Sequence, residues 1–331
     1  MSTRLRDAQV ASGTSLRILI TGATGVVGRR VVPQLVAIGH RVTAVGRTPE
    51  KRDALAAAGA TPVALDLFDA GAVRRALDGH DVAINLATHI PPSAGRMMLR
   101  WEWRENDRLR RDASAILAAA ATTAGVGRFI QESFAPIYDD YGAQWIEESG
   151  RQRPAPFNRT VLDAERSAQR FTESGGTGVV LRFAGFYGPD AFLHDMANVV
   201  RRGWSPLPGA AKSYWSSVSH DDAATAVIAA LGVAAGAYNV CDDEPLTRRA
   251  WTDALATAVG APPPKLMPAW LLKLGGAAVE VLSRSQRMSH VKLTAASGWR
   301  PRWRSAREGL QEAVRQLEMG GATLEHPRRT A

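Results

Sequence analysis

Three evenly spaced glycines near the amino end constrain the fold more than any other feature of this sequence. Gly22, Gly25 and Gly28 directly follow the β-branched and leucine-rich segment 16–21 and directly precede an apolar-periodic segment that runs to residue 38. This order predicts a strand, a tight turn and a helix. In such a turn the first glycine permits the bend, the second lets a ligand approach the backbone, and the third allows close helix packing. The segment therefore predicts a dinucleotide-binding turn with the diphosphate at the helix N-terminus.

The remainder of the chain alternates between strand and helix patterns. Further strands are expected over 41–45, 61–65, 81–87, 128–131, 178–182 and 237–240, and helices over 51–58, 70–77, 103–124, 161–174 and 220–231. Strands that alternate with helices of this length predict parallel β-α-β units with right-handed crossovers. The expected fold class is therefore α/β, a Rossmann doubly wound parallel sheet.

After residue 182 this alternation becomes irregular, which predicts a smaller and discontinuous C-terminal substrate lobe. We expect the NAD(P)-binding Rossmann domain to comprise 15–184 and 216–240, the substrate-binding lobe 185–215 and 241–318, and flexible tails 1–14 and 319–331.

Composition narrows the classes of partner. The net charge of +9 comes mostly from scattered arginines without interleaved aromatic residues, so no nucleic-acid partner is expected. The single cysteine, Cys241, excludes an intramolecular disulfide, and the dispersed histidines predict no metal site. The amino end lacks the apolar stretch of a secretory signal, and the longest apolar window, 269–282, is too short to cross a bilayer. We therefore expect a cytoplasmic protein with no membrane partner.

The end of the second expected strand bears on the choice between NAD and NADP. In NAD-specific sites a carboxylate there binds the ribose 2′-hydroxyl. This sequence has none, and Arg47 follows the strand instead. A guanidinium suits a 2′-phosphate, with Arg29 or Arg30 available to assist, so NADP is the expected cofactor and NAD the second choice. The alternative is that Arg47 only covers the adenine face.

Further motifs follow the glycine turn in a fixed order along residues 16–310. They are Asp66-Leu67, Asn85-Leu86-Ala87-Thr88, Arg128-Phe129-Ile130 leading to Ser133, Ile137-Tyr138, Leu181-Arg182 through Tyr187-Gly188-Pro189, His220-Asp221-Asp222, and Gly298-Trp299-Arg300-Pro301. In this order the sequence resembles the extended short-chain dehydrogenase/reductase superfamily, of the NAD-dependent epimerase/dehydratase type.

The resemblance implies a set of cofactor-binding residues, a small-molecule substrate, and a homodimer formed through the helices expected at 103–124 and 161–174. The implied cofactor contacts are the turn residues Gly22, Ala23, Thr24, Gly25, Val26, Val27 and Gly28, then Arg47, Asp66 and Leu67 near the adenosine, and Leu86, Ala87, Thr88 and Phe183 farther along the site.

The resemblance also implies a catalytic serine or threonine, tyrosine and lysine, in which the tyrosine exchanges a proton with the substrate while hydride moves to or from nicotinamide. Phe157 occupies the tyrosine position and Val161 the lysine position. None of the five tyrosines is followed four residues later by lysine. Ser133 lies one residue before the usual serine position, which Phe134 occupies. We therefore expect an atypical member that lacks the Tyr-x-x-x-Lys pair.

Three functions remain open at this point. The first, which we favour, is an atypical oxidoreductase for a small, apolar carbonyl or hydroxyl metabolite. Its candidate catalytic residues are Tyr138 first, then Ser133 and His89, with Tyr141 and Tyr187 also on the nicotinamide side. The second is a non-redox lyase, isomerase or cyclase with an apolar pocket walled by Phe134, Phe157, Phe183, Phe186 and Trp204. The third is an NADP(H)-binding sensor without catalysis.

Overall fold

A single parallel sheet forms the centre of the molecule. The structure is a computed structural model that describes residues 15–91, 94–97, 99–268 and 276–320; the tail 1–14 and most of the tail 319–331 lie outside the described residues. The sheet has seven strands in the order β11-β7-β5-β4-β1-β2-β3, and every neighbouring pair is parallel. Its strands are β1 (Arg17–Thr21), β2 (Arg41–Val45), β3 (Thr61–Val63), β4 (Val82–Asn85), β5 (Arg128–Phe134), β7 (Thr177–Phe183) and β11 (Gly236–Val240).

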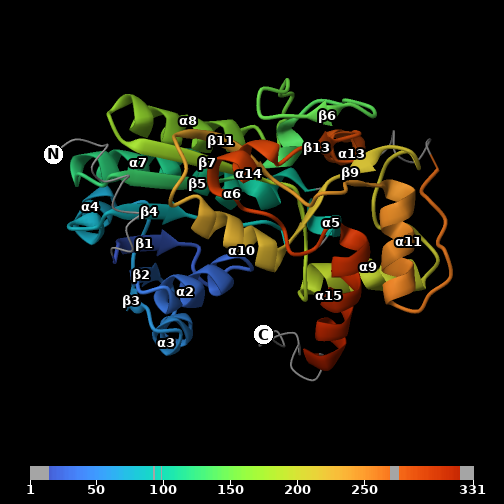
Figure 1. Cartoon of the computed structure of the whole chain (residues 1–331), viewed down its shortest axis with the longest axis horizontal. Coiled ribbons are helices and arrows are strands. Elements are labelled where there is room, and N and C mark those ends of the chain that lie inside the picture. Colours follow the sequence, from blue (N-terminus) through green and yellow to red (C-terminus); the bar gives the residue numbers. More distant parts are fainter. Residues whose placement is uncertain (1–14, 92–93, 98, 269–275, 321–331) are drawn as a thin grey trace.

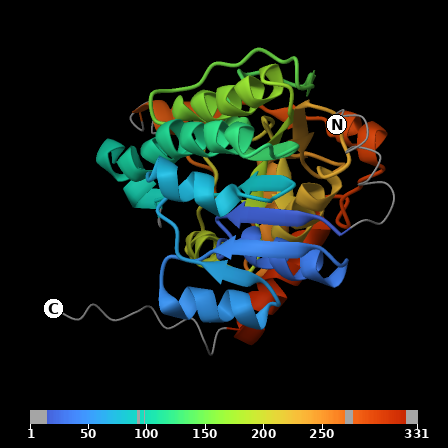
Figure 2. The same cartoon turned by 90° about the vertical axis from the view of Figure 1, so that its left-hand side faces the viewer.

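Helices cover both faces of this sheet. On one face α2 (Gly28–Ala37) packs against α10 (His220–Ala229); on the other lie α4 (Ala70–Leu77), α7 (Ser114–Thr123) and α8 (Thr160–Glu173) (Figures 1 and 2). Helix α3 (Pro49–Ala57) connects β2 to β3. The expected Rossmann doubly wound parallel sheet is thereby confirmed.

The helix expected over 103–124 is not uniform. It consists of a 3-10 turn (Arg100–Trp103), α6 (Arg104–Arg108), a π-helical turn (Leu109–Ala113) and then α7. Single π-turns within α-helices are frequent at functional sites. This one lies beside the carboxyl ends of the central strands.

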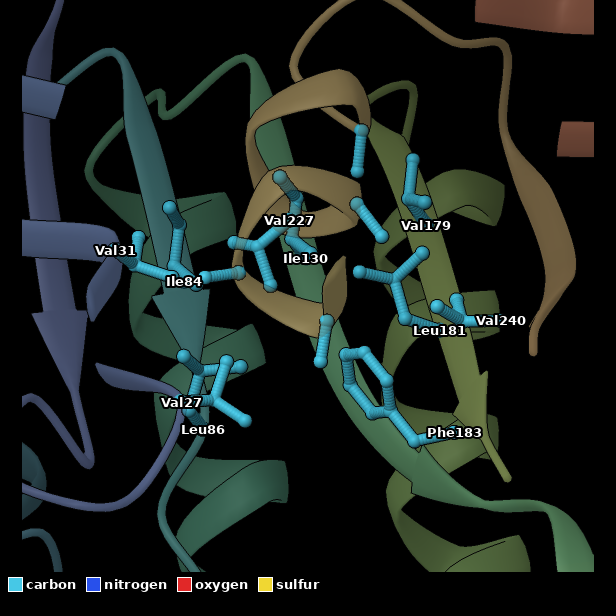
Figure 3. Close-up of a cluster of buried hydrophobic side chains, with 14 of the residues drawn as sticks. Val27, Val31, Ile84, Leu86, Ile130, Val179, Leu181, Phe183, Val227 and Val240 are labelled. Carbon is cyan, nitrogen blue, oxygen red and sulfur yellow. The ribbon is translucent and has the colours of Figure 1, made fainter. Parts of the chain in front are cut away.

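Among the described residues, buried apolar side chains form four clusters, and the two with the most members lie in different parts of the molecule. The larger fills the space between the sheet and the α2–α10 layer, where Ile84, Ile130, Leu181 and Val227 point toward one another (Figure 3). The second is built mainly from α9 (Ala191–Arg201), α11 (Arg248–Ala258) and α15 (Ala306–Gly320). These helices lie together on the opposite side of the molecule from α3 and α4 (Figure 1). The domain boundaries expected from the sequence remain a prediction.

Short elements connect the two cores. They are α5 (Ala94–Met97), the 3-10 turn Ala135–Ile137, β6 (Trp145–Ile146), β8 (Gly185–Tyr187), β9 (Tyr214–Trp215), β10 (Ser217–Ser219), β12 (Leu246–Thr247), α13 (Gly276–Ser283), β13 (Arg287–Met288) and α14 (Val291–Ser297). Within the described part of the chain, no helix is both long and apolar enough to cross a membrane.

Candidate cofactor and active site

The glycine turn has one open side, and it is at Gly25. Gly22 has a φ of 66°, and a Cβ there would lie 2.3 Å from the carbonyl oxygen of Leu86. A Cβ at Gly28 would lie 2.2 Å from the carbonyl oxygen of Gly22. A Cβ at Gly25, in contrast, would meet only the carbonyl oxygen of Gly22, at 3.3 Å. Two glycines therefore shape the turn, and the third leaves room for a ligand.

The residues of the glycine turn differ in their exposure to solvent. Gly22, Thr24, Gly25 and Val26 reach the surface, whereas Ala23, Val27 and Gly28 are buried. Val27 lies beside Leu86 in the core (Figure 3), so its side chain supports the turn from behind. The expected contacts of these three residues with a cofactor stay a prediction. The first turn of α2 carries no acidic residue, which suits a diphosphate at its N-terminus.

The ends of β2 and β3 offer polar groups for an adenosine. Arg47 is exposed directly after β2, and Asp66 and Leu67 are both accessible after β3. Arg30 is not free to assist, because its Nε forms an ion pair with Asp221 on α10 at 2.5 Å. Assistance from Arg30 is thus a wrong expectation.

A buried polar chain fixes the ends of β1, β4 and β5 relative to one another. Thr21 Oγ1 donates to Asn85 Oδ1 at 2.6 Å, and Asn85 Nδ2 donates to Gln131 Oε1 at 2.9 Å and to Ser114 Oγ at 3.0 Å. In the three residues that follow Asn85, Leu86 is buried while Ala87 and Thr88 are half-buried. The floor of the expected cofactor crevice is therefore fixed by hydrogen bonds.

Both positions at which the sequence analysis expects the family's tyrosine and lysine hold apolar side chains. Val161 is fully buried, and Phe157 is 9% exposed and packs on Trp103 with ring centroids 5.0 Å apart. Neither side chain can exchange a proton. Phe183, an expected cofactor contact, is 1% exposed and packs on Phe186.

Tyr138, the first choice as proton donor, is a buried structural residue. It is fully buried, and its hydroxyl accepts a hydrogen bond from Nη1 of Arg182 at 2.7 Å. Burial raises the pKa of Tyr138 to about 12 even though the charge of Arg182 opposes that shift. The turn Ala135–Ile137 directs Tyr138 back toward β7 and β11. This burial and these hydrogen bonds count against the predicted catalytic role of Tyr138.

The other candidate donors have different surroundings. Ser133 is buried and donates its hydroxyl to Glu165 Oε1 at 2.5 Å, so it faces α8. Tyr187 is buried against Gly309, and Tyr141 accepts a hydrogen bond from the backbone of Arg151. His89 is exposed directly beyond Thr88 and so remains available to a ligand. Trp204 is 44% exposed beside Lys265, not in a wall with the phenylalanines.

Comparisons with known proteins agree with this geometry. A family model described as NAD(P)H-binding matches residues 22–232. A 3-diazoavenalumate denitrifying reductase from a Streptomyces species is 31% identical over 315 residues, which cover 89% of this chain and 99% of that protein. The chain belongs to the NAD(P)H-binding family. Among solved structures, epimerases and dehydratases share its fold, in line with the resemblance noted from the sequence.

Two further proteins show the range of this NAD(P)H-binding family. The 2-alkyl-3-oxoalkanoate reductase of Stenotrophomonas maltophilia is 27% identical, over 75% of this chain and 77% of that protein. The dTDP-glucose 4,6-dehydratase DesIV of Streptomyces venezuelae, whose structure contains NAD, is 22% identical with a TM-score of 0.75, over 93% of this chain and 98% of that one. DesIV is similar to this chain in fold, and the two reductases are similar to it in sequence.

Sequence reasoning missed one polar cluster in this NAD(P)H-binding protein. Arg110, in the π-turn, is 1% exposed and forms an ion pair with Glu132 at 2.9 Å, while Asn106 lies one turn earlier. In the sequence, Arg110 is only one of the scattered arginines. A carboxylate between Ile130 and Phe134 in an otherwise buried strand was the signal that could have revealed it.

Proposed function

We propose that this protein is an NADPH-dependent reductase for a small, mainly apolar metabolite, with an active site that does not use the tyrosine and lysine of its family. The observation that carries this proposal is the combination of an intact glycine turn, open at Gly25, with buried apolar residues at 157 and 161. The same proposal includes a cytoplasmic location and a homodimer through the helices at 103–124 and 161–174.

The preference for NADPH rests on Arg47. It is exposed at the end of β2, where the adenosine ribose lies in Rossmann folds. The neighbouring Arg52 turns inward and donates from Nη1 to the carbonyl oxygen of Gly46 at 3.2 Å. Arg47 is thus the arginine of this loop that would hold a 2′-phosphate.

A reduced nicotinamide, when bound, supplies hydride to the substrate. Phe157 and Trp103 pack on each other near its expected position, so apolar side chains would border a substrate there. For a carbonyl substrate the proton would come from His89 or from solvent, since Tyr138 and Ser133 are turned away.

A second candidate substrate class is an aromatic diazo compound, which the name of the Streptomyces relative favours. An aryl diazonium ion already carries a positive charge, so it takes up hydride and releases dinitrogen to leave an aryl C–H bond without receiving a proton. Such a reaction matches a site with phenylalanine and valine in place of the acid.

The test is consumption of NADPH, followed by absorbance, with three kinds of substrate: 2-alkyl-3-oxoalkanoates, simple aryl ketones and aldehydes, and a carboxylated aryl diazonium salt. Reactions without protein serve as controls for direct reduction. We expect turnover with one class and a slower rate with NADH. Binding of NADPH without turnover of any class would favour the sensor or non-redox alternatives.

A further inference from the structure

The ion pair between Arg110 and Glu132 is a buried charge pair with unused hydrogen-bonding capacity. Arg110 Nη2 donates to Glu132 Oε1, but Nε and Nη1 of Arg110 and Oε2 of Glu132 have no hydrogen-bond partner among the described residues. The same holds for Nδ2 of the fully buried Asn106. Buried polar atoms in folded proteins are nearly always satisfied, so this cluster calls for a functional explanation.

The cluster lies near the carboxyl ends of two central strands, β4 and β5. Glu132 lies two residues before the carboxyl end of β5, and Asn106 Oδ1 accepts a hydrogen bond from the backbone N–H of His89, just beyond β4. The cluster therefore bridges the carboxyl ends of β4 and β5. A dinucleotide at the turn after β1 places one half toward β2, where Arg47 lies, and the other toward β4 and β5. That second half is the nicotinamide.

The surroundings support the same placement. The guanidinium of Arg110 lies 5.9 Å from the ring centroid of Phe134, the residue at the family's serine position. Asp107, on the same helix, accepts a hydrogen bond from Thr160 Oγ1 at the start of α8, next to Val161. Arg110 is thus a cation on the helix that packs against the place where the family's lysine would be.

We propose that Arg110, held by Glu132, supplies the positive charge at the nicotinamide end of this site, in place of the missing lysine. This inference rests on the proposed function. A cation near the ring disfavours the charged, oxidised nicotinamide relative to the neutral, reduced one. Arg110 would thus favour binding of NADPH over NADP⁺, as an electrostatic and positioning residue.

The inference can be tested without a known substrate, from the ratio of the dissociation constants of NADP⁺ and NADPH measured by calorimetry. Arg110→Met leaves the negative charge of Glu132 unpaired, so NADP⁺ should bind more tightly relative to NADPH. Glu132→Gln leaves the positive charge of the guanidinium unpaired, so NADPH should bind more tightly relative to NADP⁺. We expect each shift to be about tenfold, the effect of a unit charge roughly 10 Å away at an effective dielectric constant of about 20.

Three further proteins act as controls. The double variant Arg110→Met with Glu132→Leu removes both charges together, which avoids an unpaired buried charge, and should shift the ratio toward NADP⁺ by less than Arg110→Met alone. Arg110→Lys keeps the charge and should keep the ratio within about threefold of wild type. Asp81→Asn changes a carboxylate next to the opposite end of β4 and should leave the ratio unchanged.

The outcomes distinguish a failure of the inference about Arg110 from a failure of the proposed function. Opposite shifts in Arg110→Met and Glu132→Gln support the inference, and either variant alone suffices if the other does not fold. If wild type and variants bind both nucleotides with the same ratio, the inference is overturned while the proposed function stands. If the wild type binds neither nucleotide, the proposed function fails as well.

Discussion

The hydroxyl of Tyr138 donates a hydrogen bond to Oδ1 of Asn239, 101 residues farther along the chain, at 2.7 Å. It also accepts one from Arg182, which in turn forms an ion pair with Glu165 at 2.7 Å. A tyrosine from the loop after β5 thereby ties together β7, β11 and α8. Its hydroxyl therefore stabilises the fold through buried hydrogen bonds.

Replacing Tyr138 with phenylalanine should therefore lower stability and leave function intact. We expect the free energy of unfolding in urea to fall by about 1–3 kcal/mol, because Arg182 and Asn239 each lose a buried partner. The dissociation constant for NADPH should stay within about twofold of wild type. Tyr238→Phe, which removes only a bond to the backbone oxygen of Ala234, should cost less. Loss of turnover without loss of stability would restore Tyr138 as a catalytic candidate.

Arg47 should decide between the two nucleotides. Arg47→Ala removes a charge-assisted hydrogen bond to the 2′-phosphate, so the dissociation constant for NADPH should rise about tenfold or more while that for NADH changes little. Fluorescence titration with both nucleotides measures this. Arg41→Ala, at the opposite end of β2, is the matched control and should have no effect. Equal losses for NADPH and NADH would show that Arg47 covers the adenine instead.

His220 should make stability depend on pH. It is 2% exposed, and desolvation, followed by the charges of Arg30 and Arg29, lowers its pKa to about 3. The unfolded chain protonates this histidine near pH 6.5. Between these values the unfolded state binds a proton that the folded state does not, so stability is full above about pH 6.5 and falls as the pH is lowered, by about 1.4 kcal/mol per pH unit.

Urea unfolding of wild type and His220→Asn at pH 7.5 and 5 checks this expectation. The wild type should lose more stability than the variant over this interval, since asparagine does not titrate. The same loss in both proteins would mean that His220 is not the group responsible.

Much of the fold could be predicted because its signals are local. The segments that became β1, β2, β4 and β7 are short apolar runs, as expected for parallel strands buried on both faces. The glycine spacing identified the turn because backbone geometry alone requires a glycine at Gly22. The π-turn at Leu109–Ala113 was missed, since no residue in that segment breaks a helical pattern.

The candidate site was less predictable because it depends on contacts between distant segments. The direction of Tyr138 depends on Arg182 and Asn239, which the sequence does not place near it. Likewise, Glu132 and Arg110 are 22 residues apart in different elements, and only the fold brings their side chains together. The assignment of Phe157 and Val161 to the tyrosine and lysine positions stays a prediction, which rests on alignment to a motif and needs no side-chain direction.

The most direct test of the central claim is a fluorescence titration of NADPH into the wild type and Gly25→Val. The Cβ of a valine at this open position would meet only the Gly22 carbonyl oxygen, and we expect its side chain to extend into the space of the diphosphate. The account predicts saturable binding to the wild type and at least about a hundredfold weaker binding to the variant, with similar thermal stability. Failure of the wild type to bind NADPH or NADH at about 1 mM, or equal binding by both proteins, would contradict it.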